Sequence, residues 1–251
     1  IPSTDEYTNR QSNATFVDGN GIIRRSMCNQ LLYSEGFDNS YWQKNQVAVT
    51  ANAGIAPNGT QTADKVIPST LATSSHFIYT QINPGGTLSI YAKAAEYNHI
   101  SLVSQLTGQA SGATLAAGVS VNLTDGSIQT LYNATAEVID VGSGWYRITL
   151  SRTDNNIQVY YLLQPHREVI EGVSSAPQTD AFFRSNFAGD GTSGVLVWGA
   201  MQTNDLTEAG DYYKTTGTIS GPPRYSHDPE TLTPTGLYLE PAKTLLIRRN
   251  I

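Results

Sequence analysis

Apolar and polar residues alternate with a period of two along most of the middle of the chain, and helical periodicity is scarce. Because strand side chains point alternately to opposite faces, this pattern predicts β-strands. Eleven segments show the alternation or a short β-branched run: 46–51, 63–67, 76–81, 86–93, 99–105, 117–122, 127–132, 134–140, 145–151, 157–163 and 194–202. So many strands in so short a stretch predict two packed sheets.

Turn residues separate the predicted strands. Gly and Pro supply the backbone angles that turns need at 57–59, 83–86, 124–126 and 142–144. The clearest hairpin surrounds 124–126, since 119–123 and 128–132 alternate as the two halves of an antiparallel pair would. Short helices are predicted only around 40–44 and, with a weaker pattern, 204–210.

Three short segments carry most of the information about the fold: 31–42 (LLYSEGFDNSYW), 142–150 (GSGWYRITL) and 194–202 (GVLVWGAMQ). The first predicts a strand that runs into a turn and an aromatic anchor. The second predicts a Gly-Trp turn that leads into a strand, and the third predicts a buried closing strand. We expect Trp42 and Trp198 to lie in the core, whereas Trp145 could be core or surface.

Both ends of the chain differ from the predicted sandwich at 28–216. Residues 1–27 are polar apart from a hairpin pattern around 18–21, and we expect an arm or a small hairpin there. Five prolines fall in 217–251, which favours an extended arm. The large apolar residues of 236–247 indicate that this arm packs on something, such as a neighbouring subunit.

Composition narrows the classes of function. Charged residues make up 14% of 251 residues, the net charge is −6, and Lys and Arg form no run longer than a pair. Nucleic acid is therefore not an expected partner. No stretch approaches the roughly 18 apolar residues of a membrane span, so no membrane insertion is expected. The single cysteine, Cys28, excludes an internal disulfide framework and is expected to be buried. Because the chain begins without Met, we expect a fragment or a processed product.

A series of motifs resembles a module that is widespread in the virion proteins of tailed bacteriophages. The motifs are 31–42, 56–65 (APNGTQTADK), 88–94 (LSIYAKA), 142–147 (GSGWYR), 196–202 (LVWGAMQ) and 212–217 (YYKTTG). That module is a jelly roll related to carbohydrate-binding modules and concanavalin-like sandwiches. The resemblance therefore implies an all-β fold: a two-sheet antiparallel jelly-roll sandwich with extended N- and C-terminal arms.

The order of one segment departs from that family. Residues 13–23 and 223–244 are similar to the family's flanking segments, so the resemblance covers nearly the whole chain. In the family, a Pro-Arg linker precedes the LLYSE segment, whereas here Pro223-Arg224 lies after the module. Whether the C-terminal arm packs within its own chain is left open by this order.

The resemblance implies a non-enzymatic structural component of the virion: a tail fibre, a tail tip or a head decoration. It implies assembly with other virion proteins and with itself, for which we expect a homotrimer. A host-surface polysaccharide is a further expected partner, and no cofactor or catalytic residue carries over. The alternative is a carbohydrate-binding module of a glycan-degrading enzyme, and the least favoured reading is a lyase or hydrolase in its own right.

Glycan binding requires an aromatic ring for the apolar face of a sugar and polar groups for its hydroxyls. The candidate glycan-binding residues are Tyr97, His99, Tyr160 and Tyr161. Because strand neighbours face opposite ways, only one of Tyr160 and Tyr161 can join a given platform. The simpler interpretation is that these tyrosines pack within the sheets.

Carboxylates offer weaker signals. The nominal candidates for hydrolysis by paired carboxylates are Glu35 with Asp38, Asp140, and Glu168 with Glu171. None of them lies in a catalytic motif, and no Gly-x-Ser-x-Gly elbow occurs. The 35–38 turn could offer oxygen ligands to a structural calcium ion, although it lacks EF-hand spacing. No metal site is otherwise expected.

Overall fold

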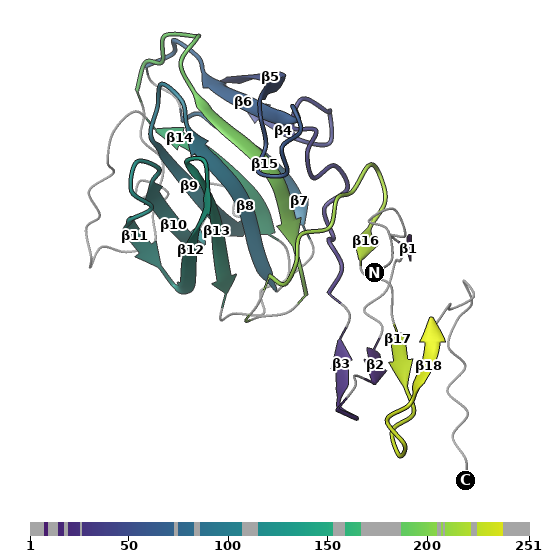
Figure 1. Ribbon diagram of the computed structural model, residues 1–251. Helices are drawn as coiled ribbons and strands as arrows, with labels where there is room; N and C mark the ends of the chain where they lie inside the picture. The colour runs from purple at the N-terminus through teal and green to yellow at the C-terminus, as the bar shows by residue number, and fades with distance from the viewer. Residues whose placement is uncertain are drawn as a thin grey trace.

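The computed structural model describes residues 8–9, 15–17, 20–25, 27–72, 75–82, 86–106, 115–152, 159–166, 187–204, 207, 209–221 and 225–237. All regular elements in these ranges are β-strands, and every pairing between them is antiparallel. Most of the strands belong to two six-stranded sheets (Figure 1).

Sheet 1 has the strand order β11-β10-β9-β14-β7-β4. Its strands are β4 (Gln43–Asn45), β7 (Phe77–Ile82), β9 (His99–Leu106), β10 (Leu115–Asn122), β11 (Ile128–Tyr132) and β14 (Val159–His166). Sheet 2 has the order β12-β13-β8-β15-β6-β5. Its strands are β5 (Val47–Gly54), β6 (Ala63–Pro68), β8 (Thr87–Ala94), β12 (Ala134–Gly142), β13 (Trp145–Arg152) and β15 (Val195–Gln202).

The main core lies between the two sheets. Sheet 1 contributes Leu102 and Val119, and sheet 2 contributes Ile90 and Ile148, all completely buried. Their neighbours along each strand point to the outer faces, as the period-two alternation requires. The result is an all-β, sandwich-like fold, as the sequence predicts.

A second, smaller core covers part of the outer face of sheet 2. Trp145 and Trp198 pack there with Ala56 and Ala63. The indole Nε1 of Trp198 donates to the hydroxyl of Thr62 at 3.0 Å, and that of Trp145 donates to the carbonyl of Ile55 at 3.1 Å. The loop that precedes β6 therefore closes over both rings. Burial of Trp198 is confirmed, and the open question about Trp145 is answered in favour of the core.

All eleven predicted strands are present, each within three residues of its predicted ends. The predicted β10–β11 hairpin is confirmed by the pairing of Val119 with Leu131. Cys28 is buried, as expected. The helix predicted around 40–44 is wrong, because that segment is a turn followed by the short strand β4. No helix occurs in those residues of 204–210 that the structure describes.

The strand predicted at the start of 31–42 is also wrong. This segment consists of bends and turns, with one isolated bridge between Tyr33 and Thr216. Its aromatic residues enter the core instead: Phe37 and Trp42 are at most 1% exposed, with ring centroids 5.0 Å apart. Tyr41 packs edge-on against Trp42 and also contacts the core. We call Phe37, Tyr41 and Trp42 the aromatic plug.

The plug lies between the two sheets on the side where β4 and β5 form their edges. Trp42 directly precedes β4 of sheet 1. The backbone N–H of Phe37 donates to Asp64 of β6, in sheet 2, at 2.8 Å. The same carboxylate accepts the N–H of Asn52 in β5 at 2.9 Å. This side of the sandwich is therefore closed by the chain itself.

Three two-stranded pairs lie beside the sandwich (Figure 1). They are β1 (Thr8–Asn9) with β16 (Ser220–Gly221), β2 (Thr15–Val17) with β3 (Ile23–Arg25), and β17 (Tyr225–His227) with β18 (Pro234–Leu237). The β2–β3 pair confirms the hairpin predicted around 18–21. A ring nitrogen of His227 lies 3.2 Å from the carbonyl of Val17, so β17 lies against β2. Within the described residues, no helix has the length and apolar character needed to cross a membrane.

Candidate functional site

Two of the residues predicted to bind glycan are buried. The ring of Tyr97 is 6% exposed, belongs to the main core and packs edge-on against Phe187 at 5.9 Å. His99 is 4% exposed, and its Nδ1 lies 2.7 Å from the side-chain oxygen of Asn98. Because that oxygen only accepts, Nδ1 donates. Neither ring offers an open face in this conformation, so their glycan-binding role stays a prediction.

Burial also affects the electrostatics of His99. Desolvation lowers the pKa of His99, and the negative charge of Asp125 only partly offsets it. The ring is therefore held in its neutral form. Its Nε2 is buried and has no hydrogen-bond partner among the residues that the structure describes. A neutral imidazole of this kind accepts hydrogen bonds through Nε2.

The two adjacent tyrosines of β14 occupy opposite faces of sheet 1, as expected from the alternation. Tyr161 pairs with Ser104 and Thr80, which are register positions on the core side. Tyr160 pairs with Gln105 and Gln81, which are positions on the outer side. By the register, His99 also occupies the outer face, so of the four candidates only His99 and Tyr160 share it.

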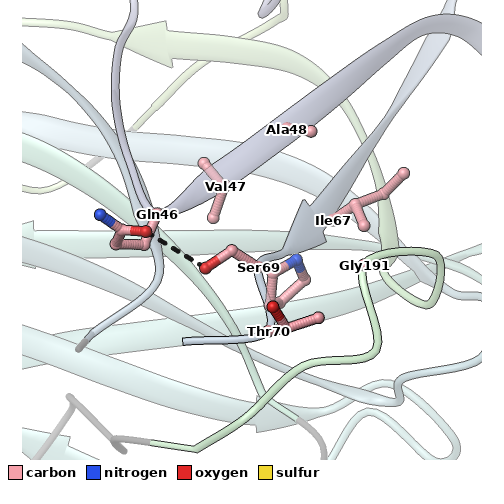
Figure 2. Close-up of a pocket in the computed structure, with 8 residues that line it drawn as sticks. Gln46, Val47, Ala48, Ile67, Ser69, Thr70 and Gly191 are labelled. Atoms are coloured by element: carbon pink, nitrogen blue, oxygen red, sulfur yellow. Dashed lines mark hydrogen bonds between the residues drawn. The ribbon is translucent and has the colours of Figure 1, made fainter. Parts of the chain in front are cut away.

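An open pocket of about 390 Å³ lies where β5 begins and β6 ends (Figure 2). This volume is within the usual range for small-molecule sites, about 300–1,000 Å³. Sequence reasoning missed the pocket completely. Its lining residues are Gln46, Val47, Ala48, Ile67, Pro68, Ser69, Thr70 and Gly191.

The pocket has three walls, formed by 46–48, by 67–70 and by Gly191, and hydrogen bonds fix the position of each wall. The N–H of Ser69 donates to the carbonyl of Gln46 at 2.9 Å, and the hydroxyl of Ser69 donates to the Gln46 side chain at 3.3 Å (Figure 2). The N–H of Gly189 donates to the carbonyl of Ser69 at 2.8 Å, which holds the third wall in place. The buried ring of His76 links Gln46 to Phe187, with ring nitrogens 2.8 and 2.7 Å from their carbonyls.

The wall formed by Gly191 is shaped by an acidic turn. The carboxylate of Asp190 accepts the N–H groups of Thr192 and Ser193 and the hydroxyl of Ser193. These hydrogen bonds, the Ser193 hydroxyl first, hold the pKa of Asp190 well below its usual value. Gly191 has φ +76°, a conformation that favours glycine. The turn is therefore tightly specified although it is exposed.

The pocket has an uncharged lining. It combines a carboxamide and two hydroxyls with the apolar side chains of Val47, Ala48 and Ile67. Hydroxyl and amide groups can both donate and accept hydrogen bonds. Such a surface suits a neutral ligand that has both hydroxyl groups and C–H faces, and it offers no counter-charge to an ion.

The sequence motifs at 31–35 and 212–216 meet in a network that we call the terminal clasp. The N–H of Ser34 donates to the hydroxyl of Thr215 at 3.1 Å, and the N–H of Thr215 donates to the hydroxyl of Ser34 at 2.8 Å. Glu35 accepts the hydroxyl of Tyr212 at 3.0 Å and forms an ion pair with Lys214 at 2.6 Å. Burial, reinforced by the Glu35 charge, strongly raises the pKa of Tyr212. The clasp joins the two ends of the sandwich.

In the 35–38 turn considered for calcium, the Glu35 carboxylate and the backbone carbonyl of Asp38 bind other groups. Glu35 belongs to the terminal clasp, and the side-chain ammonium of Lys44 occupies the turn that follows it. Its Nζ donates to the carbonyls of Asp38, Asn39 and Trp42 at 3.0, 3.1 and 3.0 Å. Within the described ranges, no three His, Cys, Asp or Glu side chains are grouped as metal ligands. The turn is thus built around a cation that the chain itself supplies.

Neither a scan against protein-family models nor a search of curated proteins finds a match for this chain. The likeness to phage virion modules therefore depends on the motif series alone.

Proposed function

We propose that this chain is a non-enzymatic structural module of a tailed-phage virion, and that its sandwich is a jelly roll that also attaches to a host-surface glycan. The strand order supports the jelly roll. The sets β6-β15-β8-β13 and β7-β14-β9-β10 are contiguous within sheets 2 and 1. From β6 to β9, each successive strand lies in the opposite sheet from the one before it. The same alternation occurs from β13 through β14 to β15. This is the connectivity expected of two interlocked Greek keys.

The uncharged pocket is the observation that carries the glycan proposal. A neutral sugar has hydroxyls that match Gln46, Ser69 and Thr70 and C–H faces that match Ile67 and Val47. The tightly bonded walls reduce the ordering cost on binding. The pocket is open, which fits one or two residues of a longer chain better than a fully enclosed small molecule.

The terminal clasp supports a role in assembly. By joining 31–35 to 212–216, it brings both ends of the sandwich to one place, from which both arms depart. The arms then contact each other through Val17 and His227. A stem of this kind would connect a sandwich to the rest of a particle. The motif series of the phage family includes both halves of the clasp.

The glycan proposal is tested by titration calorimetry with a panel of neutral and acidic polysaccharides. We expect a neutral polysaccharide to bind, and we expect Thr70→Trp, which fills the pocket from an exposed position, to weaken binding at least about tenfold. Thr50→Trp, on the exposed outer face of β5, is the matched control and should bind as the wild type does. Unchanged binding by Thr70→Trp would remove the pocket from the proposal.

The virion proposal is tested separately with antibodies raised against the purified chain. Gold-labelled antibody should decorate intact phage particles in electron micrographs. The alternative, a carbohydrate-binding module of a glycan-degrading enzyme, shares the pocket but predicts that the same antibody depletes a polysaccharide-degrading activity and leaves particles unlabelled. The two readings thus give opposite results with one reagent.

A further inference from the structure

One side of the sandwich exposes an unusual amount of apolar surface. The consecutive strands β11 and β12 form the edges of sheets 1 and 2 on the side opposite β4 and β5 (Figure 1). Nine large apolar side chains are exposed among the described residues, and these two strands carry four of them: Ile128, Leu131, Ile139 and Val141.

Two of these four residues lie on the core side of sheet 1. Leu131 pairs with Val119 and Ile128 pairs with Val121, and cross-strand partners point to the same face. Val119 and Val121 are completely buried, whereas Leu131 is 45% exposed and Ile128 is 41% exposed. Across the sandwich, the core-side Val138 of β12 is only partly buried. The core is therefore open at this side.

The backbone edge is open as well. In the described part of the chain, β12 pairs with β13 and has no strand on its other side. Neither β11 nor β12 contains Lys, Arg or Pro, the residues that usually block edge pairing. With nine residues, β12 is also the longest strand described. A long edge with exposed apolar residues and free N–H and C=O groups is a template for another strand.

We propose that this edge binds the same edge of a second copy, through antiparallel pairing of the two β12 strands about a two-fold axis at Val138. The charge pattern of the strand favours this partner. In that register Glu137 lies opposite Ile139 of the second copy, and Asp140 lies opposite Ala136, so no like charges face each other directly. The two open core margins would then close against each other, as a self-complementary interface requires. The inference stands on the edge geometry and does not depend on glycan binding.

Light scattering coupled to size exclusion tests the assembly. The whole chain should have twice its monomer mass of 27.1 kDa, about 54 kDa. Leu131→Lys and Ile139→Glu should each shift the mass towards the monomer, since the first introduces charge at an exposed apolar position of the edge and the second places a like charge opposite Glu137 of the second copy. Leu71→Lys is the matched control: Leu71 is also 45% exposed but lies outside the edge, and this variant should remain dimeric. A monomeric wild type, or the trimer mass expected from the phage resemblance, would overturn the two-fold pairing.

Cysteine cross-linking tests the register. Opposite residues of paired strands have Cβ atoms about 4.5–5.5 Å apart, close enough for a disulfide after small adjustments. Val138→Cys should therefore form a cross-linked dimer on mild oxidation, visible on a non-reducing gel. Thr135→Cys, whose two copies would be about 20 Å apart along the strands, should not. The native Cys28 is buried and gives the background. Cross-linking at 135 in place of 138 would contradict the proposed axis.

Discussion

The two sides of this sandwich differ in how the margin of the core between the sheets is covered. On the β4–β5 side, the aromatic plug enters between the sheets, and Asp64 joins it to β5 by accepting the N–H groups of Phe37 in the plug and of Asn52. On the β11–β12 side, no such segment is present among the described residues, and Leu131 and Ile128 stay exposed on the core face. A two-layer sandwich leaves its core open along both edges unless something covers them. Here one cover is intramolecular, and the other is the role we assign to a second copy.

The largest expected effect comes from removing the plug. Trp42→Ala deletes an indole that is 1% exposed and should lower the free energy of unfolding by about 3–5 kcal/mol. Leu131→Ala on the open side should change it by no more than about 0.5 kcal/mol. Urea titrations of both variants, at a concentration where light scattering finds monomers, measure the difference. Equal losses would mean that the two sides are closed alike.

The next effect concerns the carboxylate that holds the plug. Asp64→Asn keeps the shape but replaces one acceptor oxygen with an N–H donor that faces the N–H of Phe37 or Asn52. Since Asp64 is 2% exposed, we expect a loss of about 1–3 kcal/mol in the same titration. The exposed Asp211→Asn is the control and should be neutral. A neutral Asp64→Asn would show that packing alone retains the plug.

A smaller effect is expected at Lys44, whose ammonium binds three carbonyls of the turn. Lys44→Met should lower the free energy of unfolding by about 1 kcal/mol, because these carbonyls must find water instead. It should also speed amide hydrogen exchange in 38–42 while leaving β11 and β12 unchanged. Lys93→Met is the control, because the side chain of Lys93 makes no hydrogen bond or ion pair with the residues that the structure describes. Faster exchange at both sides would show that the turn is coupled to the open edge.

The smallest effect is a pH dependence confined to the plug. Burial raises the pKa of Asp64, against the hydrogen bonds from Asn52 and Phe37 that lower it. The folded state therefore holds this proton at pH values where the unfolded state has released it. Stability from this group must then fall as pH rises from the usual aspartate pKa through the raised one. Subtracting the Asp64→Asn unfolding curve from the wild-type curve across this range isolates the trend, and a rising difference would contradict it.

The strands could be predicted because alternation is a local property. Each of the eleven segments reports its own half-buried face, so β8 or β13 is recognisable without knowing its partner. The helix predicted around 40–44 and the strand predicted in 31–42 failed for the opposite reason. The conformation of Phe37 and Trp42 is set by Asp64 and by the carbonyl of Tyr33, and local propensity carries no record of such contacts.

The candidate site likewise has residues that local sequence could suggest and residues that only distant contacts bring together. The sequence favours Tyr97 and His99 as ligand-binding residues because they lie at a predicted turn with polar neighbours, but the structure buries both. The pocket instead unites Gln46, Ser69 and Gly191, which are far apart in sequence and individually unremarkable. The one local signal was positional, since Gln46 begins a predicted strand and Ser69 and Gly191 lie a few residues from an end of one. Nothing in the sequence indicated that these segments would meet.

By itself, the sequence determined an all-β chain, the positions of its strands, the β10–β11 and β2–β3 hairpins and the burial of Trp42 and Trp198. These features follow from side-chain alternation and turn chemistry within a few residues. The tertiary structure alone decided the order of strands in each sheet, the meeting of 31–35 with 212–216, the pocket and the contrast between the closed and open sides. Those depend on pairings between distant strands, which bury apolar surface cooperatively and leave no periodic trace along the chain.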